Sequence, residues 1–453
     1  MKNILMKKKN LNSIPVSKID DSIVQNVYNL NETTYYRGKN HNVEQNNEYK
    51  VIIYNKIIGT HSEDKNVCTA EFIKELSNEY LISGGTDKSL IIYNKYDKEF
   101  KKKYKIEDIK EWVYSINERK NDNTLQIMAS ANKDLYLIEL RYDKENDNFT
   151  TNLQKYEFPN MTNVCCIEMA KDNYASIGLY CSYYFYNLFN RKTDRVNHTP
   201  IINNKTFRPA IKVKENILAL ASNKVAVDGE DKLLFFNSNS KKISNEINNN
   251  YSFNFTVNGL SIIEIENDNF KNKFLLCACK KYFSDQKNGI LLVYPQIEDK
   301  RQMFENFCDT DHFEVYCFCP ITIVKTTEIT ENGKIDSKNS DFFFVGGFDN
   351  EKKEGKIRLY KIIFSEEKIK NKNEYLHDKS NTKIEYLQDI ELYQEEQNKQ
   401  KIKLAFEGPI SCIIQIKNDK NNNPNKDRIL ATCYDGNVYS FSTPNLTFYD
   451  KDK

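Results

Sequence analysis

Short apolar runs separated by polar turns recur along the chain, and Tyr80–Asn94 shows the pattern most clearly. This segment reads YLISGGTDKSLIIYN, an apolar run, three small residues, a Thr-Asp-Lys turn and a second apolar run. Two apolar runs joined by a short polar turn predict a β-hairpin. Asp87 suits the turn because its short carboxylate can accept hydrogen bonds from nearby backbone N–H groups.

The hairpin pattern occurs seven times, and a further short apolar run precedes most of the copies. Polar linkers between the units leave room for a fourth strand. The other six hairpins are Leu125–Leu140, Tyr174–Leu188, Ile217–Asn237, Phe274–Pro295, Phe342–Ile362 and Ile429–Ser442. The preceding runs are Val67–Phe72, Trp112–Ile116, Val164–Met169, Ala210–Val213, Leu260–Ile265, Val315–Ile323 and Ile410–Ile416.

The repeat predicts an all-β fold built from small, similar sheets. Four short strands per unit of about 40–45 residues is the spacing expected for the blades of a β-propeller. Such a sheet cannot bury both faces alone, so the blades stack around an axis. We therefore predict a seven-bladed β-propeller. The copy at Tyr174–Leu188 matches less well, so six and eight blades stay as alternatives.

The hairpins resemble WD40 repeats, most closely at Leu81–Asn94 and Leu430–Ser442. In that family, small residues precede an aspartate in the turn. Asp87, Asp349 and Asp435 match this position, and the resemblance implies that they are structural turn residues. The resemblance specifies a fold rather than a function.

Two family features depart from the pattern. The aromatic-Asp pair that closes the third strand is replaced, with Tyr93-Asn94 and Phe236-Asn237 standing in its place. The Gly-His dipeptide of the family is missing in every copy.

The ends of the repeat region predict how the ring closes. The last unit stops at Ser442 after its third strand, and Tyr49–Asn55 (YKVIIYN) precedes the first complete unit. WD40 propellers commonly lend an N-terminal strand to the last blade. The resemblance therefore implies that Tyr49–Asn55 completes the blade that ends at Ser442.

The rest of the chain divides by polarity. Residues 1–46 predict a loosely ordered polar tail, 47–443 the propeller, and 444–453 a C-terminal tail. Within the propeller, polar inserts near 325–340 and 366–405 are expected to be loops, since they hold few apolar residues. The second insert has room for the strand that one blade otherwise lacks.

Composition limits the classes of partner. The 29 tyrosines and 26 phenylalanines suit half-buried strands. With 66 basic and 64 acidic residues the net charge is +2, which provides no overall field for binding nucleic acid. No secretory signal or run of about 18 apolar residues is present, so we expect a cytoplasmic protein whose 11 cysteines are reduced.

The cysteine pairs are the strongest candidates for a metal site. Cys277-x-Cys279 and Cys317-x-Cys319 could supply thiolates, with His312 nearby. Structural zinc sites usually have two to four residues between paired cysteines. One intervening residue in a strand places both sulfurs on one face, which favours buried, apolar thiols. We expect no metal.

Other chemistry lacks a matching pattern. None of the five histidines stands in a signature for a catalytic base, and no phosphate-binding glycine loop is present. We therefore predict no enzymatic activity, no cofactor and no small-molecule substrate. The basic runs Lys7–Lys9 and Lys101–Lys103 are short, and Phe189–Lys192 lacks the paired arginines of lipid-binding propellers, so a membrane surface is possible but not favoured.

Our prediction is a non-catalytic scaffold that presents propeller faces to peptide or protein partners. This step is an analogy, because a fold alone does not set a function. The alternatives are a substrate-recognition or assembly subunit of a ubiquitin ligase, trafficking or cytoskeletal complex, a phosphoinositide-binding propeller, and a propeller enzyme.

Overall fold

The computed structural model of the protein describes the strands and many of the turns between them. It covers residues 53–54, 56–61, 70–76, 79–95, 103–106, 109, 113–121, 124–131, 134–143, 145–146, 148–157, 164–171, 174–179, 182–187, 192–195, 205–214, 217–224, 231–237, 239, 242–243, 251–253, 256–267, 270–281, 287–294, 304–329, 335–364, 382–390, 392–395, 401–416 and 428–442. Every regular element in these ranges is a β-strand. The predicted tails lie outside the described residues.

The strands form seven sheets of four or five strands within the described ranges, and neighbouring strands in each sheet run antiparallel. Each sheet uses strands that follow one another in the chain, except that the seventh also takes β2. Sheet 1 is β3 (Ala70–Glu75), β4 (Tyr80–Gly85), β5 (Leu90–Asn94) and β6 (Lys103–Ile106). Sheet 2 is β7 (Val113–Asn121), β8 (Thr124–Ala131), β9 (Asp134–Asp143) and β10 (Asn148–Glu157). Sheet 3 is β11 (Val164–Lys171), β12 (Tyr174–Leu179), β13 (Ser182–Asn187) and β14 (Lys192–Arg195).

Sheets 4 to 7 continue the series with the same strand order. Sheet 4 is β15 (Lys205–Lys214), β16 (Ile217–Lys224), β17 (Asp231–Asn237), β18 (Lys242–Ile243) and β19 (Tyr251–Phe253). Sheet 5 is β20 (Thr256–Asn267), β21 (Phe270–Lys280), β22 (Gly289–Tyr294) and β23 (Phe304–Asp309). Sheet 6 is β24 (Phe313–Ile329), β25 (Ile335–Asp349), β26 (Glu354–Phe364) and β27 (Thr382–Ile390). Sheet 7 is β30 (Ile410–Ile416), β31 (Arg428–Cys433), β32 (Asn437–Ser442) and β2 (Lys56–Thr60).

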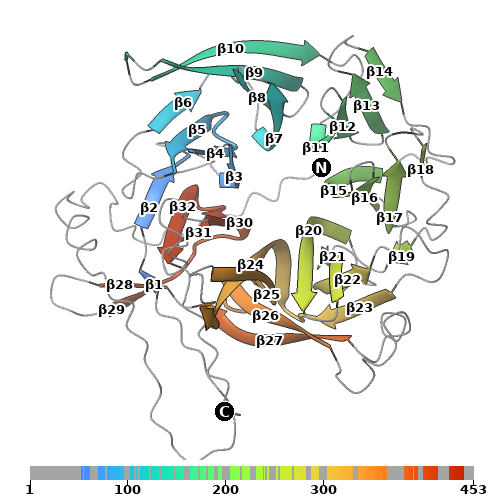
Figure 1. The fold of residues 1–453 in the computed structure, drawn as a ribbon, viewed down its shortest axis with the longest axis vertical. Helices are drawn as coiled ribbons and strands as arrows, with labels where there is room; N and C mark the ends of the chain where they lie inside the picture. Colours follow the sequence, from blue (N-terminus) through green and yellow to red (C-terminus); the bar gives the residue numbers. More distant parts are fainter. Residues whose placement is uncertain are drawn as a thin grey trace, which may run out of the picture.

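The first strands of the sheets lie nearest the centre of the molecule (Figure 1). These strands, β3, β7, β11, β15, β20, β24 and β30, contact one another in chain order, and β30 also contacts β3. Each of the seven hairpins expected from the sequence is the second and third strand of one sheet. The prediction of an all-β fold made of small antiparallel sheets is confirmed.

The core lies between the sheets, and neighbouring residues on one strand serve different interfaces. Leu81 packs in the cluster between sheets 7 and 1, whereas Ile82 packs in the cluster between sheets 1 and 2. Further clusters join sheets 4 and 5, 5 and 6, and 6 and 7. Because both faces of a sheet are covered, β5 (LIIYN) reads as an almost continuous apolar run instead of alternating.

The strand that completes sheet 7 differs from the one expected. β2 pairs antiparallel with β32 from Lys56↔Ser440 to Thr60↔Asn437. The described part of the predicted strand Tyr49–Asn55 is β1 (Ile53–Tyr54), which pairs in parallel with β28 (Leu392–Glu395) in a small sheet with β29 (Lys401–Leu404). The assignment to Tyr49–Asn55 was wrong because it followed apolar content, while the pairing uses the less apolar run beside it.

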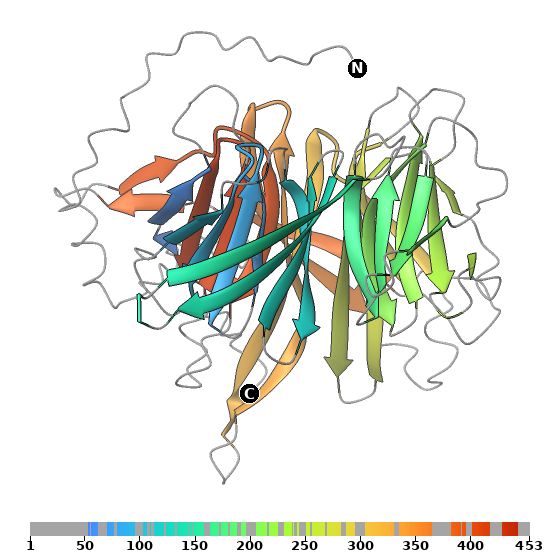
Figure 2. The same ribbon diagram turned by 90° about the horizontal axis from the view of Figure 1, so that it is seen from above.

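The two polar inserts hold more strand than their composition suggests. β24 runs to Ile329 and β25 begins at Ile335, so most of 325–340 is a hairpin that extends past the other strands (Figure 2). Within 366–405, β27 pairs with β26 as the fourth strand of sheet 6, and β28 and β29 follow. Backbone pairing keeps these polar segments extended, and in β27 the few apolar residues, Ile384 and Ile390, are buried in the clusters of sheet 6.

Candidate functional site

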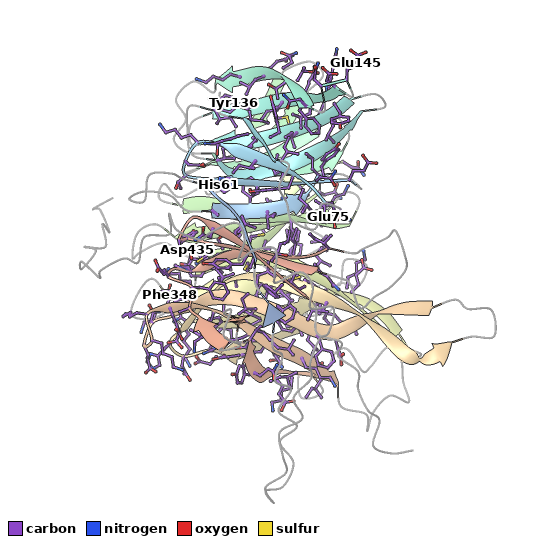
Figure 3. All side chains as sticks on the ribbon, turned by 90° about the vertical axis from the view of Figure 1, so that its left-hand side faces the viewer. His61, Glu75, Tyr136, Glu145, Phe348 and Asp435 are labelled. Atoms are coloured by element: carbon purple, nitrogen blue, oxygen red, sulfur yellow. The ribbon has the colours of Figure 1, made fainter. Side chains whose placement is uncertain are left out.

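The turns between second and third strands define one end of the molecule, which we call the turn face. Asp87, Asp349 and Asp435 lie in or beside these turns in sheets 1, 6 and 7. Figure 3 shows His61, Phe348 and Asp435 toward this side, and Glu75 and Glu145 toward the opposite one. The sequence-predicted aspartates thus share a face without forming one site.

Asp87 and Asp435 use their carboxylates within their own turns. The Ser89 backbone N–H and hydroxyl donate to Asp87 Oδ1 and Oδ2, at 3.3 and 2.6 Å. The Asn437 N–H donates to Asp435 Oδ1 at 2.9 Å, and the Tyr439 hydroxyl donates to Asp435 Oδ2 at 2.6 Å. Gly436, between them, has φ of 88°, a conformation that glycine adopts without strain.

Asp87 has a second partner, His61, which comes from the strand that completes sheet 7. The His61 backbone N–H donates to Gly436 O at 2.8 Å, which ties it to the turn of sheet 7. Its fully buried ring reaches into sheet 1, where Nδ1 lies 3.0 Å from Asp87 Oδ1 and Nε2 lies 2.7 Å from Ser83 Oγ. One residue therefore joins the last sheet to the first.

The relay from His61 continues to a buried tyrosine. Ser83 Oγ lies 3.1 Å from the hydroxyl of Tyr93, whose pKa is raised far above its ordinary value by burial. The Asp87 carboxylate can only accept, so the proton in this bond is carried by His61 Nδ1. Ser83 Oγ lies between His61 Nε2 and the Tyr93 hydroxyl, so every group in the chain of bonds has a partner.

Sequence reasoning missed His61, because it looked for an adjacent Gly-His pair. Here Gly59 and His61 are separated by Thr60, and the register between β2 and β32 shifts between Ile57 and Gly59. A signal was present: a histidine two residues after a glycine, in the connection that precedes the first strand of a unit.

A group of charged and aromatic side chains, the Arg358 cluster, lies on the turn face of sheet 6. It comprises Asp349, Lys356, Arg358, Tyr386 and Asp389. The Arg358 guanidinium lies 5.5 Å from the Tyr386 ring centroid, and Arg358 Nε donates to Asp389 Oδ1 at 3.1 Å. Lys356 Nζ lies 3.0 Å from Asp349 Oδ2 and 3.0 Å from Asp389 Oδ2.

Contacts with a buried aromatic ring and with the turn between β25 and β26 hold the Arg358 cluster in place. The other face of the Arg358 guanidinium lies 4.0 Å from the ring centroid of Phe313, a buried residue at the start of β24. The Tyr386 hydroxyl donates to Asp389 Oδ1 at 3.0 Å. Asp349 Oδ1 accepts from the N–H groups of Glu351 and Lys352 at 3.1 and 3.0 Å.

These contacts set the charge states in the Arg358 cluster. Burial lowers the pKa of Lys356, but its bonds to Asp349 and Asp389 outweigh that effect and hold the pKa above its ordinary value. Burial raises the pKa of Asp349, but the Lys352 N–H and Lys356 outweigh it and leave the pKa lowered. Burial and the Asp389 carboxylate raise the pKa of Tyr386 to about 12. The ion pairs are thus stable at neutral pH, while Tyr386 stays 48% exposed.

A second polar group joins sheets 5, 6 and 7 near their inner strands. Lys280 Nζ lies 2.7 Å from Glu314 Oε2 and donates to the Tyr316 hydroxyl at 2.9 Å. The rings of Tyr316 and Tyr434 meet edge to face with centroids 6.0 Å apart. This group ties three sheets together and offers no free nucleophile.

The candidate metal ligands are separated. Cys277 and Cys279 are fully buried in the apolar cluster between sheets 4 and 5, and burial raises the pKa of Cys277. Burial likewise raises the pKa values of Cys317 and Cys319. His312 is 66% exposed and lies 3.2 Å from Glu351 Oε1. The part of the chain that the structure describes holds no group of three or more His, Cys, Asp or Glu side chains fit for a metal ion.

No family model matches the chain, and no curated protein matches it. Among solved structures, the crystal structure of the WD40 β-propeller domain of Doa1 aligns with 86% of this chain and 97% of that chain. The TM-score is 0.45 and the sequence identity 13%. No helix in the described ranges is long and apolar enough to span a membrane.

Proposed function

We propose that the protein is a closed, seven-bladed WD40-type propeller that acts as a non-catalytic scaffold for protein partners. Support for the closed ring comes from two relationships between the ends of the chain. β30 contacts β3, and β2 pairs with β32 while His61 bonds into sheet 1. The seven sheets of the described ranges would then be seven blades.

The observation that carries the scaffold role is the Arg358 cluster. Its arginine and tyrosine are residue types that dominate binding energy at protein interfaces. The side chains are already ordered by mutual bonds, so a partner would lose little conformational freedom in engaging them. Arg358 and Asp389 are partly exposed, with side-chain exposures of 19% and 29%, which gives the accessible part of the patch both signs of charge for selecting a partner.

The non-catalytic part of the proposal follows from how the polar groups are used. Asp87, His61 and Asp435 are occupied in turns and in the relay that joins two sheets. We propose no cofactor and no small-molecule substrate. A cytoplasmic location fits the seven described cysteines, all of which are free thiols.

The scaffold role is tested by purifying tagged full-length protein from its native cells and quantifying retained proteins by mass spectrometry. We expect a stoichiometric partner set that R358A and Y386A each deplete, and that K273A, an exposed lysine of β21, leaves unchanged. A partner set untouched by the two cluster variants would move the interface elsewhere. No enriched protein at all would overturn the scaffold role.

Closure is tested by two truncations that differ by little sequence. Removing residues 1–61 deletes β2 and His61, whereas removing residues 1–46 leaves both in place. We expect the longer deletion to lower the unfolding temperature and broaden the transition, and the shorter deletion to leave both unchanged. Equal unfolding of the two truncated proteins would overturn the proposed closure.

A further inference from the structure

The outer edge of sheet 2 differs from the other outer edges. β10 has ten residues, and all ten pair with β9 from Asn148↔Asp143 to Glu157↔Asp134 without a register shift. Among the described strands, the other outer edges are shorter: β2 and β27 also contain register shifts, and the remaining five have between two and six residues. β10 lies on the outside of the ring (Figure 1).

Long, regular edge strands are uncommon on free proteins, because their unpaired N–H and C=O groups can accept a strand from another chain. Proteins usually shorten such edges, bulge them, or place proline and inward-pointing charges on them. β10 (NFTTNLQKYE) has none of the first three, and a single lysine near its end. Its two adjacent threonines favour extended backbone.

One face of β10 carries an aromatic residue, Phe149, near the start of the strand. Phe149 is almost buried, and its ring lies 5.3 Å from Tyr142, 4.9 Å from Tyr80 and 5.8 Å from Tyr104. Tyr80 and Tyr104 belong to sheet 1, so the β9–β10 hairpin reaches across to it, as Figure 2 shows. Tyr142 is 42% exposed. A side chain next to Phe149 on an added strand would meet tyrosine rings.

The opposite face of the same edge carries an acceptor-rich row. Gln126 Nε2 donates to Glu139 Oε1 at 2.6 Å, and Asn152 Nδ2 of β10 lies 3.4 Å from Glu139 Oε2. Glu139 has no cation against it among the described residues. Gln126 is 4% exposed, and its Oε1 has no hydrogen-bond partner in the part of the protein that is described. This row therefore favours a positively charged donor.

We propose that β10 docks an extended segment of a protein partner, which adds antiparallel to sheet 2 as a further strand. This inference rests on the scaffold role and names the chemistry of one partner segment. Residues opposite Asn152 and Phe149 would be three positions apart and on opposite faces. The segment therefore reads basic-x-x-apolar, with Lys or Arg directed to Glu139 and the apolar side chain against Phe149.

The test selects binders from a library of random ten-residue peptides on purified full-length protein, then measures their affinity by fluorescence polarisation. Successive N–H groups along an edge strand point alternately inward and outward. Proline removes one backbone N–H, and losing an inward N–H breaks the pairing with β9 and destabilises the protein. Whichever of T150P and T151P keeps the wild-type circular dichroism and unfolding temperature has therefore lost an outward N–H, and it serves as the edge-blocked variant. E139Q tests the basic position, and E385Q on β27 is its matched control.

We expect selected peptides to share the basic-x-x-apolar spacing, with roughly tenfold weaker binding to the edge-blocked variant. E139Q should weaken the binding of peptides that carry the basic residue severalfold. The control variant E385Q should bind the same peptides with wild-type affinity. If both prolines unfold the protein, E139Q against E385Q decides the matter alone.

Three results would overturn the inference. Peptides insensitive to the edge and Glu139 variants would bind elsewhere, and the scaffold role would stand. Failure to select any peptide, while native partners still copurify, would remove the β10 site alone. A wild-type dimer that the edge-blocked variant converts to monomer in analytical ultracentrifugation would make a second copy of the chain the occupant instead.

Discussion

The His61 imidazole lies 3.0 Å from the Asp87 carboxylate, although the two residues belong to different sheets. His61 follows β2, which completes sheet 7, and Asp87 occupies the turn of sheet 1. Both are nearly inaccessible, with side-chain exposures of 0% and 7%. This buried contact therefore links the two ends of the repeat region.

Replacing His61 by alanine should lower the free energy of unfolding by about 2–4 kcal/mol, because Asp87 and Ser83 would lose a buried partner. Urea titration followed by tyrosine fluorescence measures the change. H312A is the matched control: His312 is 66% exposed against Glu351, so its loss should cost less than about 0.5 kcal/mol. Equal effects would show that the His61 relay contributes nothing special.

D349N should make the free energy of unfolding less dependent on pH in the acidic range. The pKa of Asp349 is lowered in the folded protein, so its charged form contributes stability above the unfolded value of about 3.9. That contribution is lost as pH falls through the folded pKa. We expect D349N to cost about 1–2 kcal/mol at neutral pH and progressively less below pH of about 4. A difference from wild type that is constant across this range would contradict the assignment.

Two tyrosine hydroxyls donate to aspartates, one in a buried and one in an exposed position. Comparing them separates the contribution of the hydrogen bond to stability from the contribution of its burial. Tyr439 is 6% exposed and donates to Asp435, whereas Tyr386 is 48% exposed and donates to Asp389. Y439F should lower the free energy of unfolding by about 1–2 kcal/mol, and Y386F by less than about 0.5 kcal/mol. The reverse order in urea titrations would refute this.

Among the seven described thiols, Cys308 should react fastest with a maleimide. Burial raises the pKa of Cys308, but the nearby Lys383 opposes this, and the residue lies half-buried on the outer strand β23. Thiolate is the reactive form and needs access to the reagent, so the buried Cys277, Cys279, Cys319 and Cys433 should react only on unfolding. Peptide mapping by mass spectrometry after brief labelling gives the order, and C308S shows which signal is lost.

The repeat made the sheets predictable from sequence, because each strand buries both faces between neighbouring sheets. Hairpins such as Tyr80–Asn94 need only local alternation of apolar runs and turns, which sequence displays directly. The strand that completes sheet 7 was misplaced because its choice depends on β32, a partner far away in sequence. Composition also misjudged 325–340, where backbone pairing rather than apolar content keeps the strands extended.

The candidate site was largely beyond sequence reasoning. The turn aspartates could be found because each bonds within its own turn. The Arg358 cluster could not, since Phe313, Arg358 and Asp389 come from three strands whose register brings them together. His61 shows the intermediate case, a recognisable residue whose spacing from glycine is one position too long.

The pairing of β2 with β32 also orders events during synthesis. β2 leaves the ribosome before any other strand of its sheet, yet its partner β32 is made only after sheets 1 to 6. The Ser411 hydroxyl likewise donates to Ala70 O across 341 positions of sequence. Middle sheets can assemble as they emerge, because each is contiguous in the chain. β2 must wait, and until β32 is made it lacks its pairing strand, so chaperones or early partners can hold it.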